Sequence, residues 1–138
     1  MEWGRHLAAH LKAGDIICLS GDLGSGKTTL VKGLAKGLRI KESEVNSPTF
    51  VLMNCYQGNL PLFHFDLYRL DESIEMFNLG YEEFMYGEGI AVVEWAEKLG
   101  ILFPQDCLMV RMQMQKENER LLEVSAQGDR SLKILDRL

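Results

Sequence analysis

A short glycine-rich segment near the N-terminus carries the pattern of a nucleotide phosphate-binding loop. Residues 21–28 read GDLGSGKT, which matches G-x-x-x-x-G-K-[ST] at every fixed position. Glycines let backbone N–H groups approach the α- and β-phosphates closely, Lys27 can reach the β- and γ-phosphates, and the Thr28 hydroxyl can bind Mg²⁺. The predicted cofactor-binding residues are Gly21, Asp22, Leu23, Gly24, Ser25, Gly26, Lys27, Thr28 and Thr29.

Two acidic residues compete for the second magnesium position. Glu94 follows the apolar run at residues 90–93, as expected for a central parallel strand beside the loop strand. Asp66 follows a run that His64 interrupts, which is more typical of a strand with one exposed face. We therefore expect Thr28 and Glu94 to hold the metal and Asp66 to position or deprotonate the attacking water, or to fix a switch loop. The alternatives are an exposed strand-end carboxylate for Glu94 and a cap or turn acid for Asp66.

Two further residues could contribute to this chemistry. Thr49 follows Pro48 at the start of an extended segment, where its hydroxyl could sense the γ-phosphate as in switch loops. The alternative is an ordinary threonine at the start of a strand. His64 is expected to be a structural partner rather than a catalyst. The predicted catalytic residues are Asp66, Lys27 and Thr49.

Several elements must position these side chains. The apolar run at residues 16–19 predicts a strand covered on both faces, and the segment through Leu30 and Leu38 predicts a helix whose Gly33 and Gly37 pack closely on the sheet. Residues 50–56 and 62–68 read as an antiparallel pair, residues 108–114 and 121–126 as a hairpin, and residues 72–77 and 81–86 as a helix interrupted by Gly80. A short amphipathic helix is predicted last, with Leu132, Leu135 and Leu138 on its apolar face. These elements predict an α/β fold of the P-loop NTPase type, with a mixed, mostly parallel sheet flanked by helices.

Composition narrows the setting in which the site works. The 138 residues, 46% hydrophobic and 25% charged, predict a single domain over residues 1–138. A net charge of −5 argues against a stand-alone nucleic-acid binder. The chain has neither an apolar run long enough for a membrane helix nor a recognisable signal peptide, and its three scattered cysteines read as reduced packing residues. We expect a cytoplasmic protein.

The motifs together resemble one family. The segments GDLGSGKTT (21–29), SPTF (47–50), HFDLYRL (64–70), the LG–E pattern at residues 79–82 and VVEW (92–95) occur in the order and spacing of the TsaE family, formerly YjeE. The resemblance implies an ATPase of bacterial tRNA threonylcarbamoyladenosine biosynthesis that binds ATP or its product ADP together with Mg²⁺. It also implies that the partner is the TsaD–TsaB complex, that contact with tRNA is indirect, and that no membrane is involved.

The resemblance assigns roles by position. Thr28 and Glu94 match the magnesium residues of the family and Asp66 its essential strand aspartate, while Arg120 falls near a hairpin stretch that approaches the nucleotide. One departure concerns the base. Family members usually carry a strand and a turn before the first helix, whereas this sequence opens in what looks like that helix, which implies a more open base pocket or a shortened start.

Three other functions use the same loop. A small-molecule kinase needs an arginine-bearing lid, and the arginines here are not clustered. A GTP switch needs the N-K-x-D motif, which the sequence lacks. A nucleotide-gated binding module without significant turnover would use the same residues and stays open. For an ATPase we expect slow intrinsic hydrolysis stimulated by a partner, with Arg69 the nearest candidate for an arginine finger.

Overall fold

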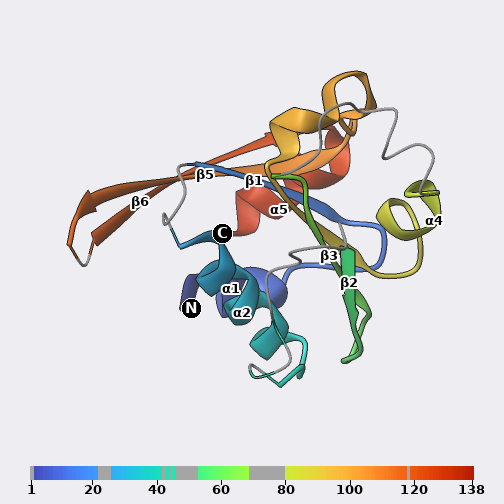
Figure 1. Cartoon of the computed structure of the whole chain (residues 1–138), viewed down its shortest axis with the longest axis horizontal. Helices are drawn as coiled ribbons and strands as arrows, with labels where there is room; N and C mark the ends of the chain where they lie inside the picture. The colour runs from blue at the N-terminus through green and yellow to red at the C-terminus, as the bar shows by residue number, and fades with distance from the viewer. Residues whose placement is uncertain are drawn as a thin grey trace.

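The chain folds around one mixed sheet, seen here in a computed structural model (Figure 1). The structure describes residues 2–21, 26–41, 43, 45, 53–68, 80–117 and 119–138. The strands are β1 (Ile16–Gly21), β2 (Met53–Tyr56), β3 (Leu62–Asp66), β4 (Ile90–Glu94), β5 (Cys107–Lys116) and β6 (Glu119–Gln127). The helices are α1 (Glu2–Ala8), α2 (Lys27–Gly37), α4 (Glu82–Met85) and α5 (Asp129–Arg137), with a 3-10 segment η2 (Ala96–Leu102).

The strand order is β2-β3-β4-β1-β5-β6. Strand β1 lies in the middle and pairs in parallel with β4 and β5, and β3 pairs in parallel with β4. The outer strands β2 and β6 are antiparallel to their neighbours, as the two predicted hairpins require. The mixed, mostly parallel α/β fold expected from the sequence is confirmed.

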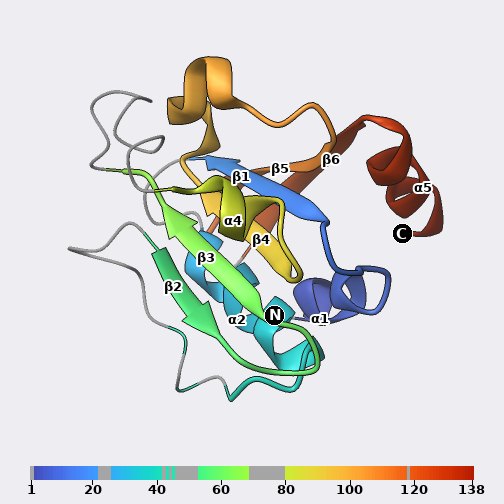
Figure 2. The ribbon, with the colours of Figure 1, turned by 90° about the vertical axis from the view of Figure 1, so that its right-hand side faces the viewer.

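Both faces of the sheet are covered, because side chains alternate along each strand. On one face Ile17 and Leu19 join a core cluster that includes residues of α1, α2 and α5. On the other face Ile16 and Cys18 join a second cluster with residues of α4 and η2. Figure 2 shows β2 and β3 toward one side of the molecule and α5 toward the opposite side.

Strand β3 differs from the expectation of one exposed face. Phe65 is 2% exposed on one face and His64 is 0% exposed on the other. The reason is position: β3 lies between β2 and β4, and both core clusters extend over it. The polar histidine in the run was therefore not a sign of solvent, because it has a buried hydrogen-bonding partner in Glu94.

The close packing that was predicted between α2 and the sheet occurs between α2 and α1. A Cβ atom on Gly4 of α1 would lie 3.0 Å from the backbone nitrogen of Leu34 in α2. Gly37 likewise faces α1, where a Cβ atom would lie 3.1 Å from the carbonyl oxygen of Arg5. The glycines thus let two helices approach, while Leu30 and Leu34 of α2 fill the core above the sheet.

The last helix is confirmed but uses another face. Leu132, expected in the core, is 47% exposed, and Ile134 is 1% exposed instead. Leu135 and Leu138 are partly buried against the same cluster.

Other expectations fall partly outside the described residues. Strand β2 is described from Met53, and the helix expected at residues 72–77 lies outside the described part, as does Asn118 of the hairpin turn. The β5–β6 hairpin is longer than expected and projects from the body of the molecule (Figure 1). Within the described residues, no helix combines the length and apolar character needed to cross a membrane.

Candidate nucleotide-binding site

The carboxyl ends of three neighbouring strands meet at one edge of the sheet. Glu94 at the end of β4 lies beside Leu19 of β1 on one side and beside Asp66 of β3 on the other. Along each strand, every second side chain lies on the same face, so Glu94 shares a face with Val92 and Asp66 shares one with Leu62. Val92 and Leu62 both belong to the core cluster that includes residues of α2. Both predicted acids therefore lie on the sheet face from which α2 starts.

The described ends of the glycine-rich loop, Gly21 and Gly26, have backbone conformations that favour glycine. Gly21 has φ +132° and Gly26 has φ +99°, values that side chains rarely adopt. A Cβ atom on Gly21 would also overlap the backbone carbonyl of Met112 in β5. The first turn of α2 is closed by the Leu30 N–H, which donates to the carbonyl of Gly26 at 3.0 Å. The intervening Asp22, Leu23, Gly24 and Ser25 lie outside the described residues.

Lys27 is a buried cation at the start of α2. Its residue is 6% exposed, and Nζ donates a hydrogen bond of 2.6 Å to the carbonyl of Gly21. Nζ also lies 4.1 Å from the centroid of the Trp95 ring, a distance at which a cation and an indole attract. The ammonium therefore lies beside the last residue of β1, where the loop segment begins.

Trp95 is a site residue that the sequence analysis did not single out as a contact of Lys27. It has φ +59°, a value unusual for a large side chain, and its ring centroid lies 5.1 Å from that of Tyr68. The sequence signal was its place directly after Glu94. No pattern in the sequence indicates that the chain turns there into the left-handed region and places the ring over Lys27.

The two acids have different surroundings. Glu94 is 3% exposed, and its Oε2 lies 2.5 Å from Nε2 of His64. Glu94 is thus not the exposed strand-end carboxylate considered above, and His64 is its structural partner. Asp66 is half-buried and accepts a hydrogen bond of 3.1 Å from the Tyr68 N–H, a contact typical of a turn acid.

The pKa of Asp66 is raised above its ordinary value. Burial of the carboxyl is the largest cause, and the negative charge of Glu94 acts in the same direction. The hydrogen bond from Tyr68 and the charges of His64 and Lys27 act in the opposite direction without cancelling the shift. A raised pKa gives Asp66 a greater proton affinity than an exposed aspartate has, as a general base requires.

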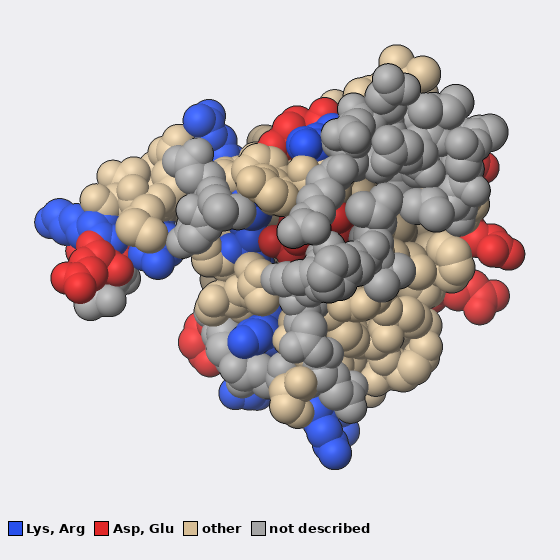
Figure 3. Space-filling model, in the orientation of Figure 1, with Lys and Arg blue, Asp and Glu red and all other residues tan. Residues whose placement is uncertain are grey.

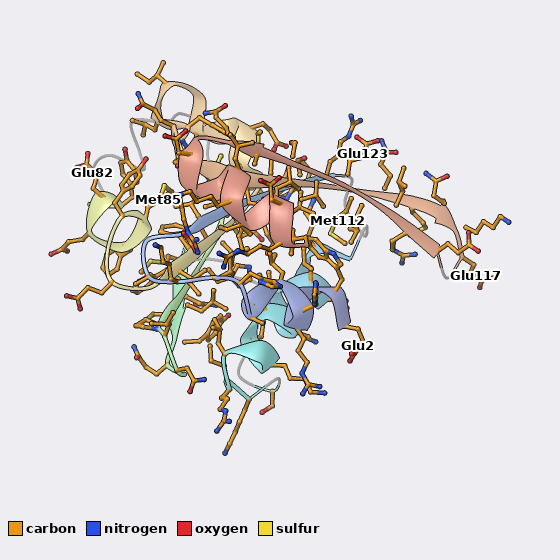
Figure 4. The ribbon with its side chains drawn as sticks, turned by 180° about the vertical axis from the view of Figure 1, so that it is seen from behind. Glu2, Glu82, Met85, Met112, Glu117 and Glu123 are labelled. Carbon is orange, nitrogen blue, oxygen red and sulfur yellow. The ribbon has the colours of Figure 1, made fainter. Side chains whose placement is uncertain are left out.

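A cavity of about 300 Å³ lies beside the start of α2. Its apolar lining comes from Trp3 of α1, Leu30 of α2 and Met112 and Leu122 of the hairpin, and Arg120 lines it as well. A Cβ atom on Gly26 would lie 3.6 Å from Nε of Arg120, so the structure brings this residue to the end of the loop. In Figure 4, Met112 lies near the body of the molecule and Glu117 at the far end of the hairpin.

The donor set suits a hard cation bound together with phosphate. Thr28 is half-buried at the start of α2, and Glu94 supplies a carboxylate at the neighbouring strand end. The described residues contain no group of three His, Cys, Asp or Glu side chains that could hold a metal alone. Mg²⁺ is commonly held by one or two protein ligands, waters and substrate phosphates, so these residues fit it. Thr49 and Arg69 lie outside the described residues, and their roles stay predictions.

Comparisons with known proteins agree with these features. A family model described as "Threonylcarbamoyl adenosine biosynthesis protein TsaE" matches residues 1–122. A tRNA threonylcarbamoyladenosine biosynthesis protein TsaE of Bacillus subtilis is 43% identical over 124 residues, which cover 89% of this chain and 77% of the relative. The protein of the same name from Treponema pallidum is 38% identical over 123 residues, covering 89% and 90%.

The fold is similar to a solved structure. The crystal structure of Bacillus subtilis YdiB matches with a TM-score of 0.79 and 34% identity, covering 97% of this chain and 82% of that one. Sequence, family model and fold lead to the same assignment. The chain belongs to the TsaE family.

Proposed function

We propose that the chain is a P-loop ATPase that binds ATP with Mg²⁺, hydrolyses it slowly and thereby supports tRNA threonylcarbamoyladenosine modification. The observation that carries this proposal is the convergence of Lys27, Glu94 and Asp66 at one edge of the sheet, beside a loop whose two described glycines have positive φ. The match to proteins named for threonylcarbamoyladenosine biosynthesis supports the biological setting.

The residues divide the work of binding. Backbone N–H groups of the loop and the first turn of α2 would hold the phosphates, and Lys27 would exchange the carbonyl of Gly21 for phosphate oxygens. Thr28 and Glu94 would hold Mg²⁺, which supplies positive charge to the phosphates during transfer. The cavity between Trp3, Leu30 and Met112 offers apolar walls for the base, with Arg120 at its side.

Asp66 would take the part of the base that orients or deprotonates the attacking water. It lies beside Glu94, so its carboxylate is close to the metal acid without being the same ligand. Its raised pKa favours proton uptake.

The partner is inferred from the family setting. We propose that the TsaD–TsaB complex binds the chain and stimulates hydrolysis. P-loop enzymes that have no arginine in place gain about 10³–10⁵ in rate when a partner supplies one. Contact with tRNA would then be indirect.

The test is ATP hydrolysis by the wild-type chain and by Asp66→Asn, each alone and with purified TsaD–TsaB. We expect slow turnover by the wild type alone, faster turnover with the complex, and loss of about 10²–10⁴-fold in Asp66→Asn, because a general base contributes about that factor. Binding of ADP, measured by calorimetry, should be unchanged in Asp66→Asn.

Each part of the proposed function is excluded by a different outcome of this test. Equal hydrolysis by wild type and Asp66→Asn would exclude the role of Asp66. A rate that does not respond to TsaD–TsaB would exclude the partner. Nucleotide binding without turnover under every condition would favour the nucleotide-gated binding module.

A further inference from the structure

A chain of four polar side chains crosses the sheet from its β2 edge to the phosphate site. The Nε2 of His64 lies 2.5 Å from Oε2 of Glu94, and the Nδ1 lies 3.4 Å from the Tyr56 hydroxyl. That hydroxyl accepts a hydrogen bond of 3.2 Å from Nδ2 of Asn54. Asn54 and Tyr56 belong to β2, His64 to β3 and Glu94 to β4, so three adjacent strands contribute.

The donors and acceptors fit one arrangement of protons. The Tyr56 oxygen accepts from Asn54 and has one hydrogen, which it can donate to Nδ1 of His64. Nδ1 is then an acceptor, so Nε2 is the ring nitrogen that has the hydrogen and donates it to Glu94. Each member thus fixes the orientation of the next.

Packing alone does not explain a histidine here. His64 is 0% exposed, and its neighbours Leu62 and Val92 belong to an apolar cluster. An aliphatic side chain could fill this space without the cost of burying a polar ring. A polar ring is needed here because Glu94 is itself 3% exposed, and a buried carboxylate needs an N–H partner to satisfy its oxygen atoms and fix its orientation.

We propose that His64 is a positioning residue for Glu94. Its Nε2–H holds Oε2, which would leave Oε1 to face the magnesium site, while Tyr56 and Asn54 hold the imidazole in the required tautomer. The proposal rests on the proposed function, because it requires Glu94 to be the magnesium acid. Groups that orient a metal-binding residue in this way typically change metal affinity by about 10–100-fold when they are replaced.

The test measures how much Mg²⁺ tightens ADP binding. The dissociation constant of ADP is measured by calorimetry with saturating Mg²⁺ and with EDTA, and the ratio reports the metal contribution. We expect His64→Phe and His64→Asn to reduce this ratio by about 10–100-fold, with the value in EDTA unchanged. His64→Gln, whose amide nitrogen can occupy the position of Nε2, should retain most of the ratio. His6→Gln, an exposed histidine of α1, is the matched control.

Glu94→Gln separates the two proposals. If Glu94→Gln has the ratio of the wild type, Glu94 is not the magnesium acid and the proposed function loses its metal site. If Glu94→Gln lowers the ratio but His64→Phe and His64→Asn do not, only the role of His64 is overturned. In the double variant His64→Phe/Glu94→Gln we expect no loss beyond that of Glu94→Gln, whereas additive losses would show that His64 acts independently of Glu94.

Replacing a buried ring could also unfold the chain, so circular dichroism accompanies each measurement. Tyr56→Phe gives a milder probe, because it keeps the aromatic ring and removes only the hydroxyl beside Nδ1. We expect a smaller loss of the Mg²⁺-dependent ratio in this variant. If the His64 variants do not fold and Tyr56→Phe has the ratio of the wild type, the inference is overturned.

Discussion

At the scale of the residue, two glycines with positive φ differ in what surrounds them. Gly21 at the end of β1 has φ +132°, and a side chain there would meet the backbone of Met112 in β5. Gly14 in the turn before β1 has φ +94°, and nothing lies within 4 Å of the position a Cβ would take. Glycine is therefore needed at position 21 both for the backbone conformation and for the close approach of β5. At position 14 it is needed for the backbone conformation alone.

Alanine at each position should separate these requirements. We expect Gly14→Ala to lower the free energy of unfolding by about 1–2 kcal/mol through backbone strain alone. Gly21→Ala should lower it by about 2–5 kcal/mol, because the carbonyl of Met112 must also move. Urea denaturation of both variants measures the difference, and equal losses would contradict the close approach of β1 and β5 at Gly21.

The sequence motifs single out the candidate site residues, whereas the contacts between them could not be predicted. The loop motif indicates Gly21 and Lys27 because phosphate binding restricts both the backbone and the charge. The cation–aromatic contact of Lys27 with Trp95 depends on a left-handed residue after β4, which no local pattern encodes. The pairing of His64 with Glu94 joins residues thirty positions apart, so it follows only from strand register.

At the scale of the element, α5 is held by a carboxylate from another part of the chain. Asp106, just before β5, accepts hydrogen bonds of 3.0 Å from the backbone N–H groups of Arg130 and Ser131, and one of 2.6 Å from the Ser131 hydroxyl. The two backbone N–H groups belong to the first helical turn, where the helix itself offers them no acceptor. Arg130 also pairs with the buried Asp15 at 3.0 Å, which ties the start of α5 to the turn before β1.

Loss of the Asp106 charge should weaken this attachment. We expect Asp106→Asn to lower the free energy of unfolding at neutral pH by about 1–2 kcal/mol, as for loss of a helix cap. Asp136→Asn, an exposed position in the same helix, is the matched control and should change it little. Urea denaturation at a series of pH values provides the measurement.

The pH dependence has a definite sign. Burial raises the pKa of Asp106, but the hydrogen bonds from Ser131 and Arg130 lower it more, so the pKa lies below its ordinary value. A lowered pKa in the folded state means that the stabilisation is present above the ordinary carboxylate pKa, near 4, and is lost as pH falls through the lowered value. The difference in the free energy of unfolding between wild type and Asp106→Asn should therefore become smaller as the pH falls. A difference that stays constant with pH would contradict the role of the charge.

The same anchoring explains why the exposed and buried faces of α5 were not predicted correctly. Leucine spacing placed Leu132 in the core, whereas Ser131 is 2% exposed and Ile134 is 1% exposed. The hydrogen bonds to Asp106 require Ser131 to face inward, and this rotates Leu132 toward solvent. Periodicity predicted the helix correctly, and a capping residue distant in sequence determined its rotation.

At the scale of the whole molecule, the candidate site draws on segments from most of the chain. Lys27 begins α2, Asp66 and Glu94 end β3 and β4, and Met112 and Arg120 line the cavity from the projecting hairpin. Figure 3 shows charged side chains of both signs at the far end of this hairpin, where Lys116 and Glu117 are exposed. Apolar runs predicted the central strands. The side on which the β5–β6 hairpin pairs with β1 depends on tertiary packing, so the position of the hairpin beside the loop could not be predicted from the sequence.

Because these segments meet only in the folded chain, a bound nucleotide should stabilise the fold as a unit. A ligand present at about 100 times its dissociation constant adds about 2.7 kcal/mol, which for a chain of this size raises the midpoint of thermal unfolding by about 10 °C. We expect Mg·ADP to produce this shift in the wild type and in Lys36→Ala, whose exposed lysine lies in the last turn of α2. Lys27→Ala should show little or no shift, because the buried ammonium beside Gly21 is lost.

Two probes show whether the stabilisation reaches the whole chain. Far-ultraviolet circular dichroism follows all helices and strands, and tryptophan fluorescence follows Trp3 in α1 and Trp95 after β4. Both tryptophans border the site. A ligand that stabilised only the site would therefore raise the unfolding midpoint measured by fluorescence more than the midpoint measured by circular dichroism. We expect the two midpoints to rise together. Separate midpoints, or an equal shift in Lys27→Ala, would contradict a nucleotide site built from segments that meet only in the folded chain.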